Sequence, residues 1–368
     1  MKNRSFRLKG PKIFHSLLLY LHDERAHYFT YNLGVEKAVS QIGLAFHAYV
    51  PKSCILNLPK NWTKFFKTSR LNALQRFLDF KRVFGGKEEG RFIFLEAYNF
   101  WDLSLFLLAN FCFAKKRDVT LLMCRTGFPT QALKRFLFSL PLKTLLLKMG
   151  KRFVFLTDNE SAVHEVQTLF KRPCYVMPVI PLAPIERSCK PTLCPISCYW
   201  PGIPQPRKGL KEIEKLLTIE DLHAQNFSLS VAEDAPLLLP QNNLSIRRVK
   251  AALSRRAFLK ELCDAEIVFL PYDPLLHKKA SSGIFVEAIV AGCIPLVKEG
   301  SWLALELRKY DLAELIVSWD HPHFFTYLLT LYEDRKMLTK LAAMRAAYRK
   351  FHSIDSYSEK LREIILQF

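Results

Sequence analysis

The chain is predicted to fold as an α/β protein with parallel sheets, organised as two domains. Its 368 residues exceed what one ordinary hydrophobic core holds together. Short apolar runs alternate with longer helical patterns in both halves, which is typical of strands connected by helices. With 50% hydrophobic and 24% charged residues, the composition is that of a globular protein and argues against long disordered segments.

In the first half, five apolar runs are expected to form strands with helices between them. The expected strands cover residues 13–21, 45–50, 92–95, 119–124 and 153–157. The clearest helical patterns cover residues 28–43 and 71–84.

A proline-rich stretch separates the two halves. Nine prolines lie between residues 173 and 206, and because each fixes φ and removes a backbone donor, the stretch is expected to be an extended connector. We therefore expect a first domain over residues 1–180 and a second over residues 181–345. The rest, residues 346–368, is expected to be a C-terminal helix that returns to the first domain.

The second half restarts the alternation. Strands are expected at residues 196–199, 227–231, 266–270 and 294–297. Helices are expected at residues 209–217, 256–263, 283–291, 302–309 and within 336–368.

No segment is expected to cross a membrane or to serve as a signal peptide. The apolar run 13–21 contains His15 and lacks a cleavage site of small residues, so a first strand is favoured. Residues 100–114 include Asp102 and Asn110 and fall short of the roughly 18 apolar residues a span needs, which favours a buried helix.

The nine cysteines have no paired spacing, which indicates a reducing cytoplasm as the compartment. Cys189, Cys194 and Cys198 lie close enough in sequence to suggest a metal site, but their spacing matches no usual zinc pattern. Inert thiols are therefore favoured, and neither a metal nor a cofactor is expected.

The residues most informative about function follow the strand expected at 266–270. That strand ends at Pro271, and a loop then leads to Ser281, Ser282 and Gly283, where a helix is expected to begin. A serine caps free helix amides, and glycine lets a ligand approach the backbone closely. A helix N-terminus at the carboxyl end of a strand favours phosphate, because its amides and its dipole both attract anions.

One helical turn further on, Glu287 is expected beside that anion site. A carboxylate there can accept hydrogen bonds from two neighbouring hydroxyls, which is what a ribose offers. Phosphate and ribose together indicate a nucleotide diphosphate. Each piece also has an ordinary structural interpretation, since capped helices after strands are common and a helical glutamate usually faces solvent.

The motif SSGIFVEA at 281–288, followed by GCIPLV at 292–297 and Trp302, resembles the nucleotide-binding signature of glycosyltransferase family 4. The segments AEIVFLP at 265–271 and RKG at 207–209 also resemble elements of that family, and a looser likeness covers residues 26–43, 155–158 and 176–181. The resemblance implies the GT-B fold, which has two Rossmann-like domains facing across a cleft. It also implies a transfer of sugar from a nucleotide-diphosphate sugar with retention of configuration.

The resemblance assigns roles by position. Glu287 would bind the ribose, and the amides near Gly283, Ile284 and Phe285 would bind the diphosphate. Lys208, with Arg207, would stabilise the negative charge of the leaving diphosphate, which a fixed cation does without a metal. A solvated loop in a basic protein is the alternative for this last pair.

Two departures from the family pattern leave the sugar open. Lys279 stands where members carry a second glutamate that contacts the sugar, so Ser281 and Ser282 become the nearest candidates. Gly202 is followed by Ile203, where an arginine is common. A catalytically inactive relative and a sugar-nucleotide epimerase of the same fold stay as alternatives.

The formal net charge of +20 indicates a polyanionic partner. A nucleic-acid-binding protein is the runner-up from another class, but no known reading motif is present. Residues 60–91 carry nine basic and three acidic residues, and residues 115–152 carry ten basic and one acidic. In both stretches the basic residues are interleaved with aromatic and aliphatic residues. This pattern suggests binding to an anionic membrane surface, unless the apolar faces pack into the core.

Three residues of the first half are candidates for contacting the acceptor. His15 and His27 lie near the ends of the first expected strand and helix, and Arg125 follows the fourth strand. A structural hydrogen-bonding role is the alternative for each.

Overall fold

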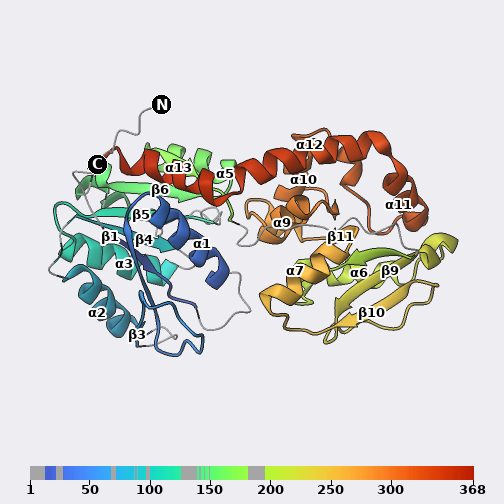
Figure 1. The fold of residues 1–368 in the computed structure, drawn as a ribbon, viewed down its shortest axis with the longest axis horizontal. Helices are drawn as coiled ribbons and strands as arrows, with labels where there is room; N and C mark the ends of the chain where they lie inside the picture. The colour runs from blue at the N-terminus through green and yellow to red at the C-terminus, as the bar shows by residue number, and fades with distance from the viewer. Residues whose placement is uncertain are drawn as a thin grey trace. The chain divides into compact units, whose positions relative to one another are not determined.

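The structure is a computed structural model that describes residues 13–21, 28–67, 72–86, 88, 90–96, 100–125, 139–140, 142–144, 146–148, 150–180 and 195–368. The chain divides into two compact units (Figure 1). Unit 1 comprises Met1–Leu182 together with Ser353–Phe368, and unit 2 comprises Ala183–His352. The division near the C-terminus thus falls between His352 and Ser353, seven residues after the boundary at 345/346 that the sequence predicted.

Unit 1 contains a parallel sheet of seven strands in the order β3-β2-β1-β4-β5-β6-β7. The chain builds outward from β1 to β3 and then returns to place β4 on the other side of β1. The strands are β1 (Ile13–Leu17), β2 (Ala45–Pro51), β3 (Trp62–Phe66), β4 (Arg91–Glu96), β5 (Val119–Met123), β6 (Phe153–Thr157) and β7 (Cys174–Val176).

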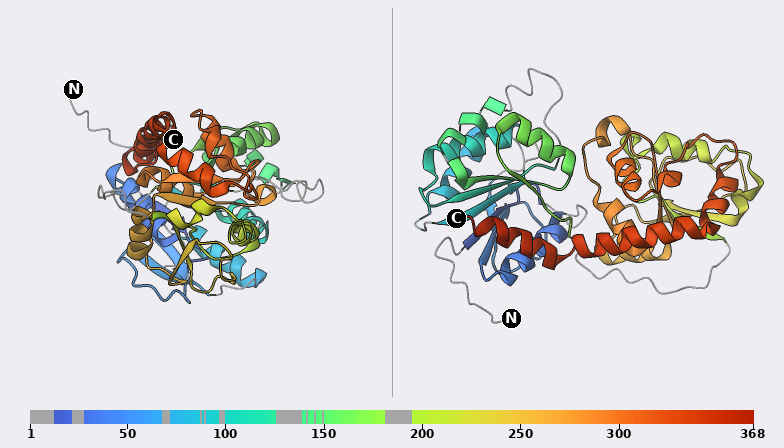
Figure 2. Two further views of the ribbon diagram at one scale, coloured as in Figure 1. Left: turned by 90° about the vertical axis from the view of Figure 1, so that its right-hand side faces the viewer. Right: turned by 90° about the horizontal axis from the view of Figure 1, so that it is seen from above.

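Helices cover both faces of this sheet, because alternate strand residues point to opposite faces and both sets are apolar. One core joins the sheet to α1 and α13, and Figure 2 shows the red α13 beside the blue α1. The other core joins it to α2, α3 and α5. The helices are α1 (Tyr28–Gln41), α2 (Ala73–Phe84), α3 (Phe100–Phe113), α5 (Glu160–Phe170) and α13 (Ile354–Ile365).

Unit 2 contains a parallel sheet of five strands in the order β10-β9-β8-β11-β12. Tyr199 and Val268 are register partners and face α7, where Phe258 packs on Tyr199. Phe269 points to the opposite face and packs on Phe324 of α11. The strands are β8 (Ile196–Tyr199), β9 (Phe227–Ala232), β10 (Ser245–Val249), β11 (Ile267–Leu270) and β12 (Ile294–Val297).

The longer helices of unit 2 include α9, which is almost wholly buried, and α12, which packs along it. Arg345 and Arg349 of α12 donate through Nε to the carbonyl of Val290, in the last turn of α9. The helices are α6 (Leu210–Leu216), α7 (Arg255–Asp264), α8 (Pro274–His277), α9 (Gly283–Ala291), α10 (Trp302–Arg308), α11 (Phe324–Glu333) and α12 (Arg335–Phe351).

These two parallel-sheet units confirm the predicted α/β class. Three strands were not predicted: β3, β7 and β10. Strand β10 carries Arg247 and Arg248 at the edge of its sheet, so it lacks an apolar run. Strand β7 is only three residues long.

Strand β3 lies inside the first basic stretch, which changes how that stretch is interpreted. Trp62 and Phe66 are buried in the two cores of unit 1, so these aromatic side chains do not form a surface. Arg76 is also buried and lies 3.1 Å (Nε to Oδ1) from Asp102 of α3. Within the described residues, no helix is long and apolar enough to cross a membrane.

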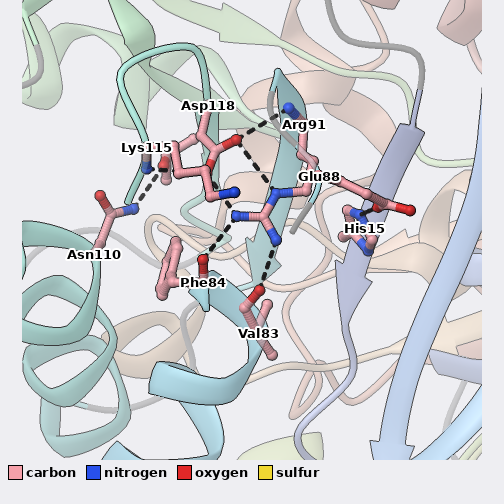
Figure 3. A network of polar contacts seen from close by, with 9 residues as sticks. His15, Val83, Phe84, Glu88, Arg91, Asn110, Lys115 and Asp118 are labelled. Atoms are coloured by element: carbon pink, nitrogen blue, oxygen red, sulfur yellow. Dashed lines mark hydrogen bonds and ion pairs between the residues drawn. The ribbon is translucent and has the colours of Figure 1, made fainter. Parts of the chain in front are cut away.

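Arg91, at the start of β4, forms a buried network at the amino end of the sheet (Figure 3). Its Nη2 donates to Oδ2 of Asp118 at 2.7 Å, and its Nη1 and Nη2 donate to the carbonyls of Val83 and Phe84. Those carbonyls belong to the last turn of α2, where a cation is favoured. The network therefore joins α2, β4 and the turn before β5.

Candidate functional site

The candidate site lies at the carboxyl edge of the unit 2 sheet, between β8 and β11. The chain leaves β8 toward β9 and β10 and then returns to place β11 on the other side of β8. The connections after β8 and β11 therefore diverge at this point. Open parallel sheets bind ligands in the crevice formed at such a position.

Gly209 lets the connection after β8 touch the end of β11. Its φ is +84°, and a Cβ at this position would lie 2.3 Å from Cγ and from the carbonyl oxygen of Pro271. The backbone of Asp273 also donates to the carbonyl of Arg207 at 3.1 Å. Only glycine combines this conformation with this contact, which gives the RKG motif a physical reason.

Lys208 and Arg207 are held on this connection. The indole Nε1 of Trp200 donates to the carbonyl of Lys208 at 3.1 Å, and the Nζ of Lys208 lies 3.7 Å from the ring centroid of Tyr272. Arg207 is exposed, and its Nε donates to Oε1 of Gln205. Both cations therefore border the loop after β11.

Two polar side chains that follow β11, those of Tyr272 and of His277 at the end of α8, have no hydrogen-bond partner among the described residues. Their rings are 4.6 Å apart between centroids. Among the residues that the structure describes, none forms a hydrogen bond with the Tyr272 hydroxyl or with either ring nitrogen of His277. Burial and the cations of Lys208 and Arg207 lower the pKa of His277 to about 4, while Asp273 acts in the opposite direction. His277 is therefore neutral near pH 7.

The N-terminus of α9 forms as expected at Ser282. The side-chain oxygen of Ser282 accepts from the amide of Phe285 at 3.3 Å, and its carbonyl accepts from the amide of Val286 at 3.1 Å. The amides of Gly283 and Ile284 precede these bonds and are the ones available to an anion. Phe285 departs from the expectation, because its amide is used by the cap and its ring packs on Trp302.

Glu287 lies on the same helix and already has a partner in the protein. It is 6% exposed, and its two oxygens accept from Arg255 at 2.6 and 3.0 Å. Arg255 begins α7 directly after the cap residue Ser254. The sequence reasoning missed Arg255, since nothing local marks it and 32 residues separate it from Glu287.

The connection after β8 also passes near the start of α9. A Cβ on Gly202, in the connection after β8, would lie 3.8 Å from Cδ1 of Ile284 at the start of α9. Ser281 and Lys279 are half-buried in the loop that leads into this helix. The connection that carries Lys208 thus contacts the end of β11 and passes near the first turn of α9.

In unit 1, Arg125 lies at the carboxyl edge of the sheet with two carboxylates. It pairs with Glu96 at the end of β4 and, at 3.3 Å, with Asp158 after β6. Its guanidinium lies 4.2 Å from the ring centroid of Tyr31, whose hydroxyl is 3.5 Å from that of Tyr357 in α13. Burial raises the pKa of Tyr31 to about 12, so this hydroxyl stays protonated.

His15, the second acceptor-side candidate, does not lie with Arg125. His15 is a buried residue of β1, its ring is stacked on Tyr49, and its Nε2 lies 3.7 Å from Oε2 of Glu88 (Figure 3). Glu88 precedes β4, so His15 faces the amino side of the sheet, whereas Arg125 lies at the carboxyl edge. His27 lies outside the described residues.

The basic stretch 115–152 does present charge to solvent. Lys143 and Lys148 are exposed, and the Nζ of Lys148 lies 4.3 Å from the ring centroid of Phe111 in α3. Helix α3 was expected to be buried, but one side is not: Trp101 is 59% exposed and Leu108 51%. Lys134 and Arg135 lie outside the described residues.

Within the described part of the chain, no three His, Cys, Asp or Glu residues are grouped so as to hold a metal ion. Cys198 lies in β8, where burial raises the pKa of its thiol. Cys189 and Cys194 lie outside the described residues.

No protein-family model matches this chain, and no curated protein matches it in sequence. Solved structures do match its fold. The N-terminal domain of Candida albicans trehalose-6-phosphate phosphatase is 9% identical, with a TM-score of 0.67 and coverage of 99% of this chain and 98% of that one. Sucrose-phosphate synthase from Thermosynechococcus elongatus is 11% identical, with a TM-score of 0.64 and coverage of 97% and 98%.

A third match is trehalose-6-phosphate from E. coli bound with UDP-2-fluoro glucose. It is 11% identical, with a TM-score of 0.63 and coverage of 97% of this chain and 99% of that one. At such identities the likeness establishes the fold and not the activity. The chain has two Rossmann-like units, and its fold is that of the GT-B glycosyltransferases.

Proposed function

We propose that the chain is a glycosyltransferase that takes its sugar from a nucleotide-diphosphate sugar bound in unit 2. The observation that carries the proposal is the meeting of three elements between β8 and β11. The connection with Lys208 contacts the loop after β11 at Pro271 and passes near the first turn of α9, since a Cβ added to Gly202 would lie 3.8 Å from Cδ1 of Ile284. A cation, free helix amides and a carboxylate on α9 are thereby gathered in one region of the unit.

In this proposal, the amides of Gly283 and Ile284 bind the diphosphate, and Lys208 with Arg207 stabilises its charge as it leaves. Fixed donors and cations stabilise a leaving diphosphate without a metal. Glu287 binds the ribose hydroxyls. A carboxylate has about four acceptor positions, and Arg255 uses two, so two are left for the two hydroxyls.

Arg255 then acts as a positioning residue for Glu287, because a bidentate contact fixes the plane of the carboxylate. Retention of configuration follows from the family resemblance, which is its support. The half-buried Ser281 is the nearest candidate for contacting the sugar, since Lys279 cannot accept from hydroxyls.

We further propose that the acceptor is a lipid in an anionic membrane, approached by unit 1. Trp101, Leu108 and Phe111 are exposed on α3, and Lys148 lies beside Phe111. Apolar side chains bordered by lysines suit insertion at an anionic lipid surface. Arg125 with Glu96 and Asp158 offers hydrogen-bonding groups for a polar head group at the carboxyl edge.

Calorimetry with UDP-glucose, GDP-mannose and ADP-glucose tests the donor assignment directly. One of the three is expected to bind saturably without a divalent metal, and EDTA is not expected to change its affinity. Absence of binding by all three at millimolar concentration would overturn the proposal.

A second candidate is a module that binds a nucleotide sugar without transferring it. Two observations favour keeping it: Lys279 replaces the glutamate of the family pattern, and one structural neighbour is a domain of a phosphatase. Release of nucleoside diphosphate in the presence of acceptor distinguishes the two functions, because a binding module releases none.

A further inference from the structure

Tyr272 and His277 have hydrogen-bonding groups that the described protein does not use. The Tyr272 side chain is completely buried, and its hydroxyl has no partner among the described residues. Both ring nitrogens of His277 are also buried and have no hydrogen-bond partner among the described residues. Most buried polar groups in folded proteins are paired, so two neighbouring side chains without partners require an explanation.

Their surroundings indicate what they bind. The Nζ of Lys208 lies 3.7 Å from the Tyr272 ring, and the cations of Lys208 and Arg207 both act on His277. A location beside these two cations repels a positively charged ligand and attracts an anion. A phenol hydroxyl and a neutral imidazole can each donate one hydrogen bond to an anionic oxygen.

We propose that Tyr272 and His277 bind the diphosphate of the nucleotide sugar, each donating a hydrogen bond to a phosphate oxygen. The inference rests on the proposed function and adds two residues that recognise the ligand. It also explains why the short connection from Pro271 to His277 is held against Gly209: the contact sets both side chains beside Lys208.

Binding of the diphosphate should also change the proton held by His277. Lys208 and Arg207 disfavour the imidazolium in the free protein, Asp273 favours it, and burial opposes it. A diphosphate offsets the two cations, so binding raises the pKa of His277 and the protein takes up a proton. The affinity for the ligand therefore increases as pH falls.

The hydroxyl of Tyr272 is tested by Tyr272→Phe, which removes one oxygen and leaves the ring. The affinity for UDP-glucose, or for whichever probe of the panel binds best, is expected to fall about ten- to a hundredfold. The Tm is expected not to fall, because the lost hydroxyl had no partner in the described protein. Tyr332→Phe is the control. The hydroxyl of Tyr332 donates to Glu266 at 2.6 Å, so this variant is expected to have a lower Tm and an unchanged affinity for the probe.

His277 is tested by calorimetry of UDP-glucose in buffers of different ionisation enthalpy. The diphosphate of the probe stays ionised over the range in which histidine titrates, about pH 5 to 8. If the pKa rises from about 4 to its ordinary 6.5, the affinity increases about tenfold between about pH 7.5 and 5.5. His277→Gln should abolish the increase, and His323→Gln, an exposed histidine of the same unit, should keep it.

The outcomes separate the two proposals. If a nucleotide sugar binds, and neither Tyr272→Phe nor His277→Gln changes its affinity or proton uptake, the inference is wrong and the proposed function stands. If no nucleotide sugar binds to the unaltered protein, both are wrong.

Discussion

Two arginine–carboxylate pairs, one in each unit, share the same chemistry and differ in how fully the protein uses it. Asp118 accepts from the amide, Nε and Nη2 of Arg91 and from the amide of Lys115, which occupies all its acceptor positions. Glu287 accepts from Arg255 alone among the hydrogen bonds of the described residues. The first pair is saturated by the protein, and the second has capacity left for a ligand.

The pair with unoccupied acceptor positions is also the more exposed of the two. The side chains of Arg91 and Asp118 are 3% and 0% exposed, whereas those of Arg255 and Glu287 are 20% and 8% exposed. A buried and saturated pair joins secondary-structure elements. A partly open pair at the carboxyl edge of a parallel sheet is placed to meet a ligand. The number of carboxylate acceptor positions that the protein leaves unoccupied therefore distinguishes a structural Arg–carboxylate pair from one placed to bind a ligand.

The largest effect is expected from breaking the saturated pair. Arg91→Ala leaves Asp118 buried without its partner and frees the carbonyls of Val83 and Phe84, so the free energy of unfolding should fall by about 3–5 kcal/mol. Urea denaturation measures it. Arg82→Ala, which removes an exposed arginine from the same stretch, should change stability by less than about 1 kcal/mol. Equal effects of the two variants would mean that the Arg91 network does not join the elements.

Gly209→Ala should disturb the open site through its backbone. The new methyl group meets Pro271 and the positive φ is strained, so we expect a loss of about 2–4 kcal/mol in the free energy of unfolding. Gly43→Ala is a matched control, because its φ is +80° and nothing lies within 4 Å of the added carbon. It should lose only about 1–2 kcal/mol. Thermal denaturation that ranks the control as the less stable variant would contradict the close contact.

The open pair itself is tested by Glu287→Gln. The amide keeps one acceptor oxygen and loses the charge, so donor affinity should fall by about 1.5–3 kcal/mol, or roughly ten- to a hundredfold. Glu261→Gln breaks a similar pair with Arg247 in the same unit and should leave donor affinity unchanged. Calorimetry that finds the two variants alike would remove Glu287 from the binding site.

The smallest effect per residue is expected at the surface of unit 1. Lys143 and Lys148 are exposed, and each should contribute about 1 kcal/mol to binding of anionic vesicles at low salt. Charge reversal of both should release the protein from vesicles that contain phosphatidylserine and leave donor binding intact. Equal sedimentation with neutral vesicles would assign the contact to the apolar residues of α3, and no sedimentation with either would favour a soluble glycan as acceptor.

Local patterns in the sequence were sufficient for most of the fold. The apolar runs at β5, β6, β11 and β12 and the cap at Ser282 were predicted, because each depends on neighbouring residues along the chain. Strand β10 was missed because its charged residues lie at a sheet edge. For the basic stretch 60–91 two interpretations stayed open, since composition does not reveal that Arg76 and Arg91 are buried.

By itself, the sequence determined the α/β alternation and the helix beginning at Ser282. Only the tertiary structure decided which groups have partners. Arg255 meets Glu287 across 32 residues and Arg91 meets Asp118 across 27, and neither spacing has a local signature. Likewise, Tyr272 and His277 gain significance only from being buried beside Lys208 without partners in the described chain. Hydrogen-bond saturation depends on every element packed around a group, so it is settled by the assembled fold.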